Sequence, residues 1–123
     1  MPYTHTRSIF VTTSFVGFHR WPKAPADVAY LAQLHRHVFG VELEITVEHN
    51  DRELEFHQVK RALDSYIQDT ARRRTLDDTW SCEKIAEIVC EWAMLKWPDR
   101  LAYTVEVNED GENGSLVTES LAG

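Results

Sequence analysis

The chain has 123 residues, 43% of them hydrophobic, and a formal net charge of -7. This length and composition predict one compact domain spanning residues 1–123, large enough to bury roughly two thirds of the surface that its unfolded chain exposes. The negative charge argues against general affinity for nucleic acid or anionic membranes, because neutralising phosphates requires clustered Lys and Arg side chains.

The hydrophobic pattern predicts strands and helices in a simple order. Alternation of apolar and polar residues is typical of strands, whereas recurrence every three to four residues is typical of helices. The predicted elements are a strand at 7–18, a loop or short turn at 21–29, a strand running through 34–48 with its strongest alternation at 41–48, a helix at 55–74, a second helix from 81 to the proline at 98, and strands at 103–107 and 115–121.

Arg72, Arg73 and Arg74 form a basic cluster at the end of the first predicted helix. We interpret it as a solvated helix end, where cations suit the helix dipole, with contact to a phosphate-bearing ligand as the alternative.

Cys82 and Cys90 both fall in the second predicted helix, about two turns or ~12 Å apart, too far for a disulfide. They are therefore interpreted as free thiols of a reducing compartment. The opening residues MPYTHTRS lack the apolar run of a secretory signal, and no segment approaches the length of a transmembrane helix. The expected location is the cytoplasm.

His19, His35 and His37 are the most informative side chains. His35 and His37 lie two residues apart in a predicted strand, so both imidazoles face the same side. His19 at the end of a neighbouring strand can complete a tripod. Three imidazoles with one open position are typical of a catalytic zinc site, whereas structural zinc is closed by four protein ligands. The alternative is a pair of half-exposed strand histidines without a metal.

Five segments in the same order resemble motifs of the 6-pyruvoyltetrahydropterin synthase and 6-carboxytetrahydropterin synthase family. The phenylalanine-rich run ending in a histidine resembles residues 15–19, and H-G-H-x-F resembles 35–39. The helix start D-F-x-x-L-K resembles 55–60, T-[SA]-E-N-x-A resembles 81–86, and V-x-V-x-E resembles 105–109. The similarity covers nearly the whole chain.

The resemblance implies an α+β tunnelling fold, in which four antiparallel strands carry two helices on one face and oligomerisation closes a barrel. It implies zinc held by His19, His35 and His37, and 7,8-dihydroneopterin triphosphate or a related pterin as substrate. Glu109 would anchor the ring, since a carboxylate matches two parallel N–H donors. The implied assembly is a homo-hexamer of two stacked trimers, and the need to protect exposed strand edges independently favours oligomerisation.

The proton-transfer groups of the family have no direct counterparts. Leu31 occupies the position of the catalytic cysteine, and a leucine cannot transfer a proton. The Asp-His relay is missing as well, its nearest counterpart being Asp77 and Asp78. Other residues considered for proton transfer, each against an ordinary structural role, are Cys82, His57 and His5.

Three functions remain open from the sequence. The first is a zinc-dependent lyase with altered proton-transfer groups, and the second is a divergent homologue that binds zinc and a pterin or purine-like ligand without catalysis. The third is a metal-free assembly module, in which the three histidines are coincidental.

Overall fold

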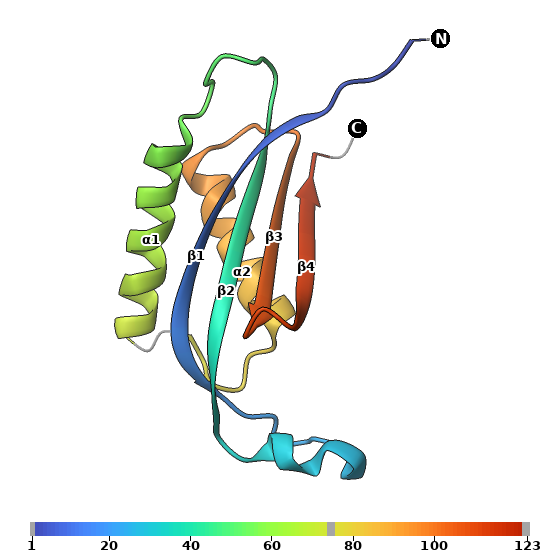
Figure 1. Ribbon diagram of the computed structural model, residues 1–123, viewed down its shortest axis with the longest axis vertical. Helices are drawn as coiled ribbons and strands as arrows, with labels where there is room; N and C mark the ends of the chain where they lie inside the picture. Colours follow the sequence, from blue (N-terminus) through green and yellow to red (C-terminus); the bar gives the residue numbers. More distant parts are fainter. Residues whose placement is uncertain (1, 74–75, 122–123) are drawn as a thin grey trace.

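The computed structural model describes residues 2–73 and 76–121, which form an open four-stranded antiparallel sheet with helices on one face (Figure 1). This confirms the predicted α+β class and element order. The elements are β1 (Arg7–His19), a 3-10 helix η1 (Ala26–Ala32), β2 (His35–Val47), α1 (Phe56–Arg72), α2 (Cys82–Lys96), β3 (Ala102–Glu109) and β4 (Asn113–Ser120).

The strands lie in sequence order, β1-β2-β3-β4, so β1 and β4 are the two edges of the sheet. Its register is continuous: His19 pairs with His35 at one end of the β1–β2 ladder, and Phe39 pairs with Glu109 at one end of the β2–β3 ladder. The end of β1, the start of β2 and the end of β3 therefore meet at one end of the sheet.

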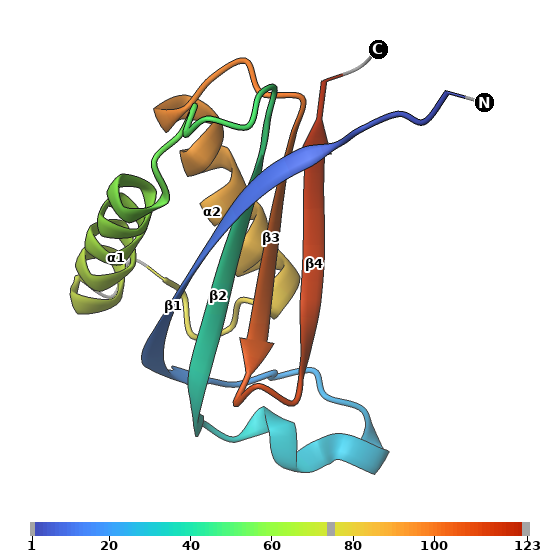
Figure 2. The ribbon, with the colours of Figure 1, turned by 45° about the horizontal axis from the view of Figure 1, so that its top comes forward.

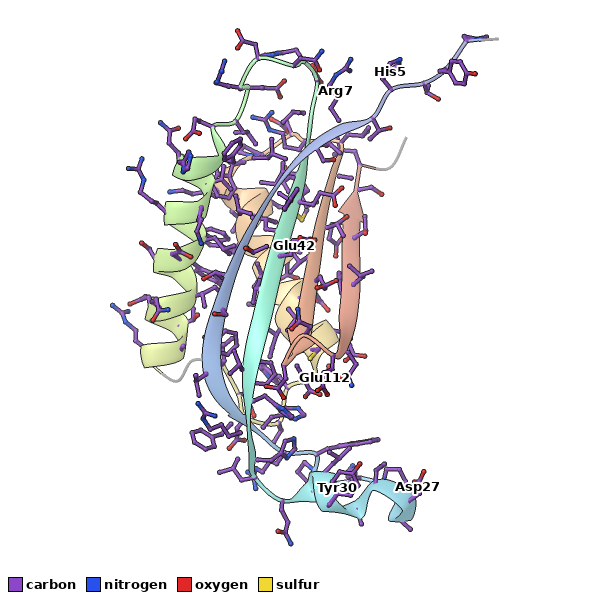
Figure 3. The ribbon with its side chains drawn as sticks, in the orientation of Figure 1. His5, Arg7, Asp27, Tyr30, Glu42 and Glu112 are labelled. Carbon is purple, nitrogen blue, oxygen red and sulfur yellow. The ribbon has the colours of Figure 1, made fainter. Side chains whose placement is uncertain are left out.

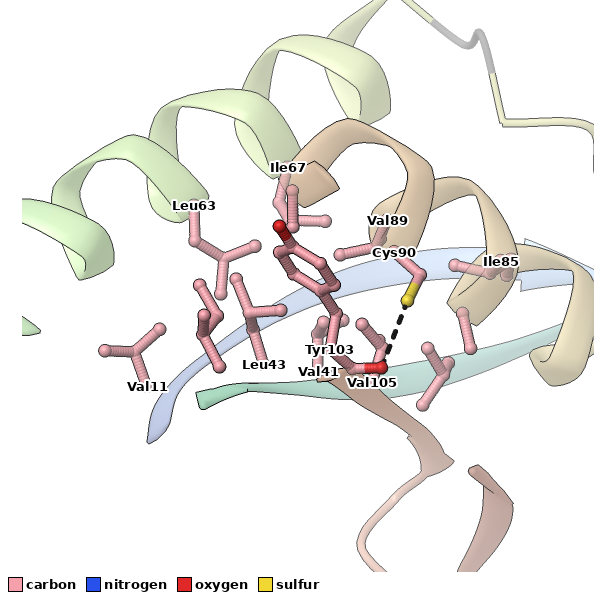
Figure 4. Packing of buried hydrophobic residues seen from close by; sticks show 14 of the residues in the cluster. Val11, Val41, Leu43, Leu63, Ile67, Ile85, Val89, Cys90, Tyr103 and Val105 are labelled. Carbon is pink, nitrogen blue, oxygen red and sulfur yellow. Dashed lines mark hydrogen bonds between the residues drawn. The ribbon is translucent and has the colours of Figure 1, made fainter. Parts of the chain in front are cut away.

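Helices α1 and α2 cover the same face of the sheet, with α1 against β1 and α2 against β3 and β4 (Figure 2). Ser81 caps α2 by accepting a hydrogen bond from the Lys84 backbone N–H at 3.1 Å, and the Glu55 side chain caps α1 similarly. Between helices and sheet lies one cluster of buried apolar side chains (Figure 4). None of the described helices is long and apolar enough to cross a membrane.

The segment after β1 is more regular than expected. Residues 26–32 form η1 instead of a loop or short turn, with backbone bonds from the Val28 N–H to the Pro25 carbonyl and from the Gln33 N–H to the Tyr30 carbonyl. A 3-10 helix needs only such short-range bonds and no apolar stripe, and η1 buries none of its residues. Its formation therefore left no periodic signal in the sequence.

The opposite face of the sheet is not covered by a helix. It carries exposed apolar side chains, including Phe10, Val16 and Leu116, together with carboxylates such as Glu42 (Figure 3). The four strands do not close into a barrel within one chain. Of the predicted basic cluster, Arg74 lies outside the described residues, while Arg73 pairs with Asp69 at 3.1 Å.

Candidate metal centre

Three histidines and one carboxylate meet at the end of the sheet beside η1. His19 is the last residue of β1, His35 the first of β2, and Glu109 the last of β3. Strand alternation directs them, with His37, toward the helix-covered face, since they share parity with the buried Phe15, Phe39 and Val107 of the same strands. The ring centroids are 5.4 Å apart for His19 and His35, and 4.7 Å apart for His35 and His37.

Hydrogen bonds fix the orientation of two of the imidazoles. Nδ1 of His35 lies 2.8 Å from the Gln33 carbonyl oxygen, and Nδ1 of His37 lies 2.7 Å from Oδ2 of Asp110. A carbonyl or an ionised carboxylate can only accept a hydrogen bond, so each Nδ1 donates and carries the proton. In the neutral tautomer that these bonds select, Nε2 of each ring carries the lone pair that a metal ligand needs.

The inward-facing nitrogens have no hydrogen-bond partner. Within the described residues, His19 Nδ1, His35 Nε2 and His37 Nε2 are buried and unpaired. A buried polar atom without a partner costs about 1–3 kcal/mol. Three such atoms in one place therefore reduce the free energy of unfolding of a small domain considerably. Three converging lone pairs fit a cation, and neutral imidazole nitrogen is a preferred ligand of zinc. The donor set thus fits the metal implied by the resemblance.

Glu109 lies against the same nitrogens. Its Oε2 is 3.4 Å from His37 Nε2 and 3.9 Å from His19 Nδ1. Among the described residues, the ligand atoms of His19, His35 and Glu109 all lie within 4.8 Å of one another. This set differs from the predicted tripod in its third member, Glu109 in place of His37. Glu109 is therefore a candidate metal ligand as well as the ring anchor that the resemblance implies.

Burial keeps His19 suited to metal binding. Desolvation lowers the pKa of His19 below its ordinary value of 6.5, and the neighbouring His35 and His37 act in the same direction. Glu109 and a hydrogen bond with the Trp80 backbone oppose this shift without reversing it. This environment favours the neutral form of His19, which has a lone pair free for a cation.

The residues considered for proton transfer are poorly placed or poorly suited for it. Burial, followed by the charges of Glu109 and Glu83, raises the pKa of Cys82 to about 11, which makes its thiol a poor proton-transfer group at neutral pH. His5 is exposed and lines a cavity that Arg100 also lines, at the far end of the sheet. His57 is exposed in the first turn of α1.

The counterparts of the family's Asp-His relay have structural roles. The Asp77 carboxylate accepts hydrogen bonds from the backbone N–H and hydroxyl of Thr79 at 2.8 and 2.6 Å. Asp78 pairs with Arg20, Oδ1 to Nε at 3.3 Å, and its carbonyl accepts from the Arg20 N–H at 2.8 Å. This loop is thereby tied to the end of β1, next to His19.

Asp110 is the site residue that the sequence did not identify. It lies in the turn between β3 and β4, and its two carboxylate oxygens accept from His37 and from the Val38 backbone N–H. These two hydrogen bonds, the backbone one foremost, lower the pKa of the Asp110 carboxyl. The sequence does mark a turn at Asp110 and Gly111, but it gives no indication that the turn faces β2.

Comparison with models of known protein families gives no match for this chain, and no curated protein is significantly similar to it. The functional assignment consequently depends on the geometry of the site and on the motifs in the sequence.

Proposed function

We propose that this protein binds zinc through His19, His35 and His37 and acts on 7,8-dihydroneopterin triphosphate or a related pterin, in the manner of the 6-pyruvoyl- and 6-carboxytetrahydropterin synthases. The observation that carries the proposal is the convergence of three buried, unpartnered imidazole nitrogens at one end of the sheet. No hydrogen bond within the described chain satisfies them, whereas a single cation satisfies all three at once.

The histidines and Glu109 have separate roles in this proposal. The histidines hold the metal, which when bound acts as a Lewis acid that makes substrate hydroxyls more acidic. Glu109 orients the substrate by accepting two N–H donors from the guanidine-like edge of the ring. Its position beside the imidazoles supports this role, because its oxygen lies 3.4 Å from His37 Nε2. The order of the five sequence motifs supports a pterin as the ligand.

A second candidate is a protein that binds zinc and a pterin or purine-like ligand without converting it. The environment of Cys82 favours this candidate, since a thiol whose pKa is raised to about 11 is almost entirely protonated at neutral pH. Leu31 supplies no replacement, and Asp77 and Asp78 are engaged in loop contacts. General acid-base catalysis is worth roughly 10²- to 10⁴-fold, so its loss would be visible in any turnover assay.

We also propose assembly into a hexamer of two trimers. Both edges of the sheet are available within one chain, and the uncovered face carries Phe10 and Leu116 at 64% and 69% exposure. Unprotected strand edges pair readily with other strands, and pairing between copies would close a barrel. Light scattering at micromolar concentration should give a hexamer, and a monomer would contradict the tunnelling fold.

The deciding experiment combines metal analysis with a turnover assay. Protein purified without chelator should carry about one zinc per chain. His37→Ala should lose the metal, while His57→Ala, which removes an exposed imidazole far from the site, should keep it. Absence of stoichiometric transition metal from the wild type, or retention by His37→Ala, contradicts the tripod. Turnover of dihydroneopterin triphosphate on the order of 1–10 per second then separates an enzyme from the binding protein of the second candidate.

A further inference from the structure

We propose that Asp110 is a positioning residue for the metal: it holds the His37 ring with Nε2 directed into the site and keeps the proton on Nδ1. This inference rests on the proposed zinc site, and it adds a residue that is not among the ligands. The Asp110 side chain contacts His37 and the backbone that follows it, so its effect on a metal acts through that histidine.

The contacts of Asp110 form a clamp on the start of β2. Oδ2 lies 2.7 Å from His37 Nδ1, and Oδ1 accepts from the Val38 N–H at 2.8 Å. The Asp110 N–H in turn donates to the Val38 carbonyl at 2.7 Å. Ring rotation at His37 would break a charge-assisted hydrogen bond, which is among the stronger bonds that a side chain makes. Both the direction of the ring and its tautomer are therefore fixed before a metal arrives.

His37 differs in this respect from the other two histidines. His35 donates to the neutral carbonyl of Gln33, and His19 is bonded to the Trp80 backbone. Only His37 among the three has a carboxylate on its outer nitrogen. A carboxylate behind an imidazole increases the basicity of the opposite nitrogen, and loss of such outer partners typically weakens metal binding by about 10- to 100-fold.

The backbone at Asp110 would tolerate a residue without a carboxylate. Its φ of +58° lies in the left-handed region, which glycine adopts most readily, and Gly111 follows at +72°. A glycine at position 110 would satisfy the turn equally well. Aspartate accepts the less favourable conformation, and its side chain makes no described contact that would stabilise the turn alone, since both oxygens bond to β2.

This conformation makes a clean test possible. Asp110→Gly removes the carboxylate while favouring the backbone geometry of the turn. Asp110→Asn keeps the size of the side chain. If its carbonyl stays on the Val38 N–H, its NH₂ group faces His37 Nδ1 and favours the proton on Nε2, the ligand atom. The matched control is Asp99→Gly, because Asp99 also has a positive φ, +65°, and lies in the loop at the far end of the sheet.

Zinc affinity is measured by competition with a chromophoric chelator, on the full chain of the wild type and each variant. We expect about 10- to 100-fold weaker binding for Asp110→Gly and Asp110→Asn, and wild-type affinity for Asp99→Gly. Nitrogen-15 NMR of the zinc-loaded proteins should show a protonated Nδ1 at His37 in the wild type, with its hydrogen-bonded proton signal lost in Asp110→Gly. A purely structural role would not change that signal.

The possible failures are distinguishable. A wild type that binds no zinc overturns the proposed metal site, and the role of Asp110 with it. A wild type that binds zinc, with both Asp110 variants matching it in affinity and in the His37 signal, overturns the positioning role alone. Should Asp110→Gly fail to fold, Asp110→Asn gives the same decision.

Discussion

The two ends of the sheet both carry partly buried polar clusters, but the clusters differ in how their hydrogen-bond donors and acceptors are paired. At the far end, Arg100 forms an ion pair with Glu53, its backbone N–H donates to the Tyr103 hydroxyl at 3.1 Å, and that hydroxyl donates to the Trp97 carbonyl. At the η1 end, one nitrogen each of His19, His35 and His37 is buried without a hydrogen-bond partner, and His37 Nε2 lies 3.4 Å from Glu109 Oε2.

The difference lies in the balance of donors and acceptors. The far cluster joins donors to acceptors within the chain, with the Arg100 Nε as its one unpaired buried atom among the described residues. The η1 cluster joins acceptors to acceptors, which is unfavourable unless a positive charge lies between them. The far cluster thus has a structural role, whereas the η1 cluster lacks a hydrogen-bond donor for its inward-facing nitrogens among the described residues. Each end can be perturbed separately.

A large effect on stability should come from removing a histidine at the η1 end, and none from removing one at the far end. Zinc at about 100 times its Kd should stabilise the wild type by about 2.7 kcal/mol, raising the unfolding midpoint on the order of 10 °C. His35→Ala should lose this stabilisation, because it removes a ligand. His49→Ala should keep it, because His49 lies at the far end, 3.6 Å from Glu53.

Scanning calorimetry with and without chelator measures both variants. A zinc-dependent midpoint that survives in His35→Ala, or disappears in His49→Ala, would show that the metal binds elsewhere and that the contrast between the ends is misinterpreted.

An effect of similar size separates the two candidate roles of Glu109. Glu109→Ala should weaken binding of a pterin or guanine analogue by roughly 2 to 5 kcal/mol and leave metal content intact, because a carboxylate that grips two N–H donors is lost. Glu106→Ala should have little effect. Glu106 lies on the uncovered face of β3, where its carboxylate accepts from the Asn108 amide at 3.1 Å.

Calorimetric titration together with metal analysis gives the answer. Loss of zinc from Glu109→Ala would instead make Glu109 a metal ligand, in keeping with its place within 4.8 Å of His19 and His35. Equal ligand affinity of the Glu109 variant and the wild type would show that the ligand class is wrong.

The sequence predicted the strands because their alternation is long and regular. In β2 the apolar Val41, Leu43 and Ile45 alternate with polar residues, and all three are buried in the structure. The same periodicity placed His35 and His37 on one face. The η1 helix escaped prediction because its bonds span three residues and it buries nothing, so no apolar pattern records it.

The site was predictable only where its members share a strand or a motif. Glu109 was identified through the resemblance, not from any local feature of β3. Asp110 and His37 are 73 residues apart in the chain, and their contact depends on the register of β2 against β3. A local pattern does not specify that register, and the Trp80 hydrogen bond to His19 depends equally on how the loop before α2 packs.

A smaller effect is expected from the ion pair at the far end. The Glu48 backbone N–H, then Arg100 and His49, lower the pKa of Glu53 below its ordinary value of 4.5. A carboxyl whose pKa is lowered by folding stabilises the protein above that value, and this contribution disappears as the pH falls through the native pKa. Glu53→Gln should therefore lower stability at pH 7 and flatten its decline below pH 4.5, without changing zinc affinity. Urea unfolding at several pH values tests this, and altered zinc affinity would mean that the two ends are coupled.

The smallest effect is a second pH window at the η1 end in the metal-free protein. Burial lowers the pKa of His19, so between the native value and 6.5 the unfolded chain binds more protons than the folded one. Stability should therefore fall as the pH drops just below 6.5, in a range separate from that of Glu53. His19→Gln should remove this step, and saturating zinc should move it to lower pH because protons must then displace the metal. Urea unfolding of chelator-treated protein from pH 7.5 to 5 measures the step. A stability that rises over this range would show that the attraction of Glu109 outweighs desolvation at His19. A step that persists in His19→Gln would show that a different group titrates in this range.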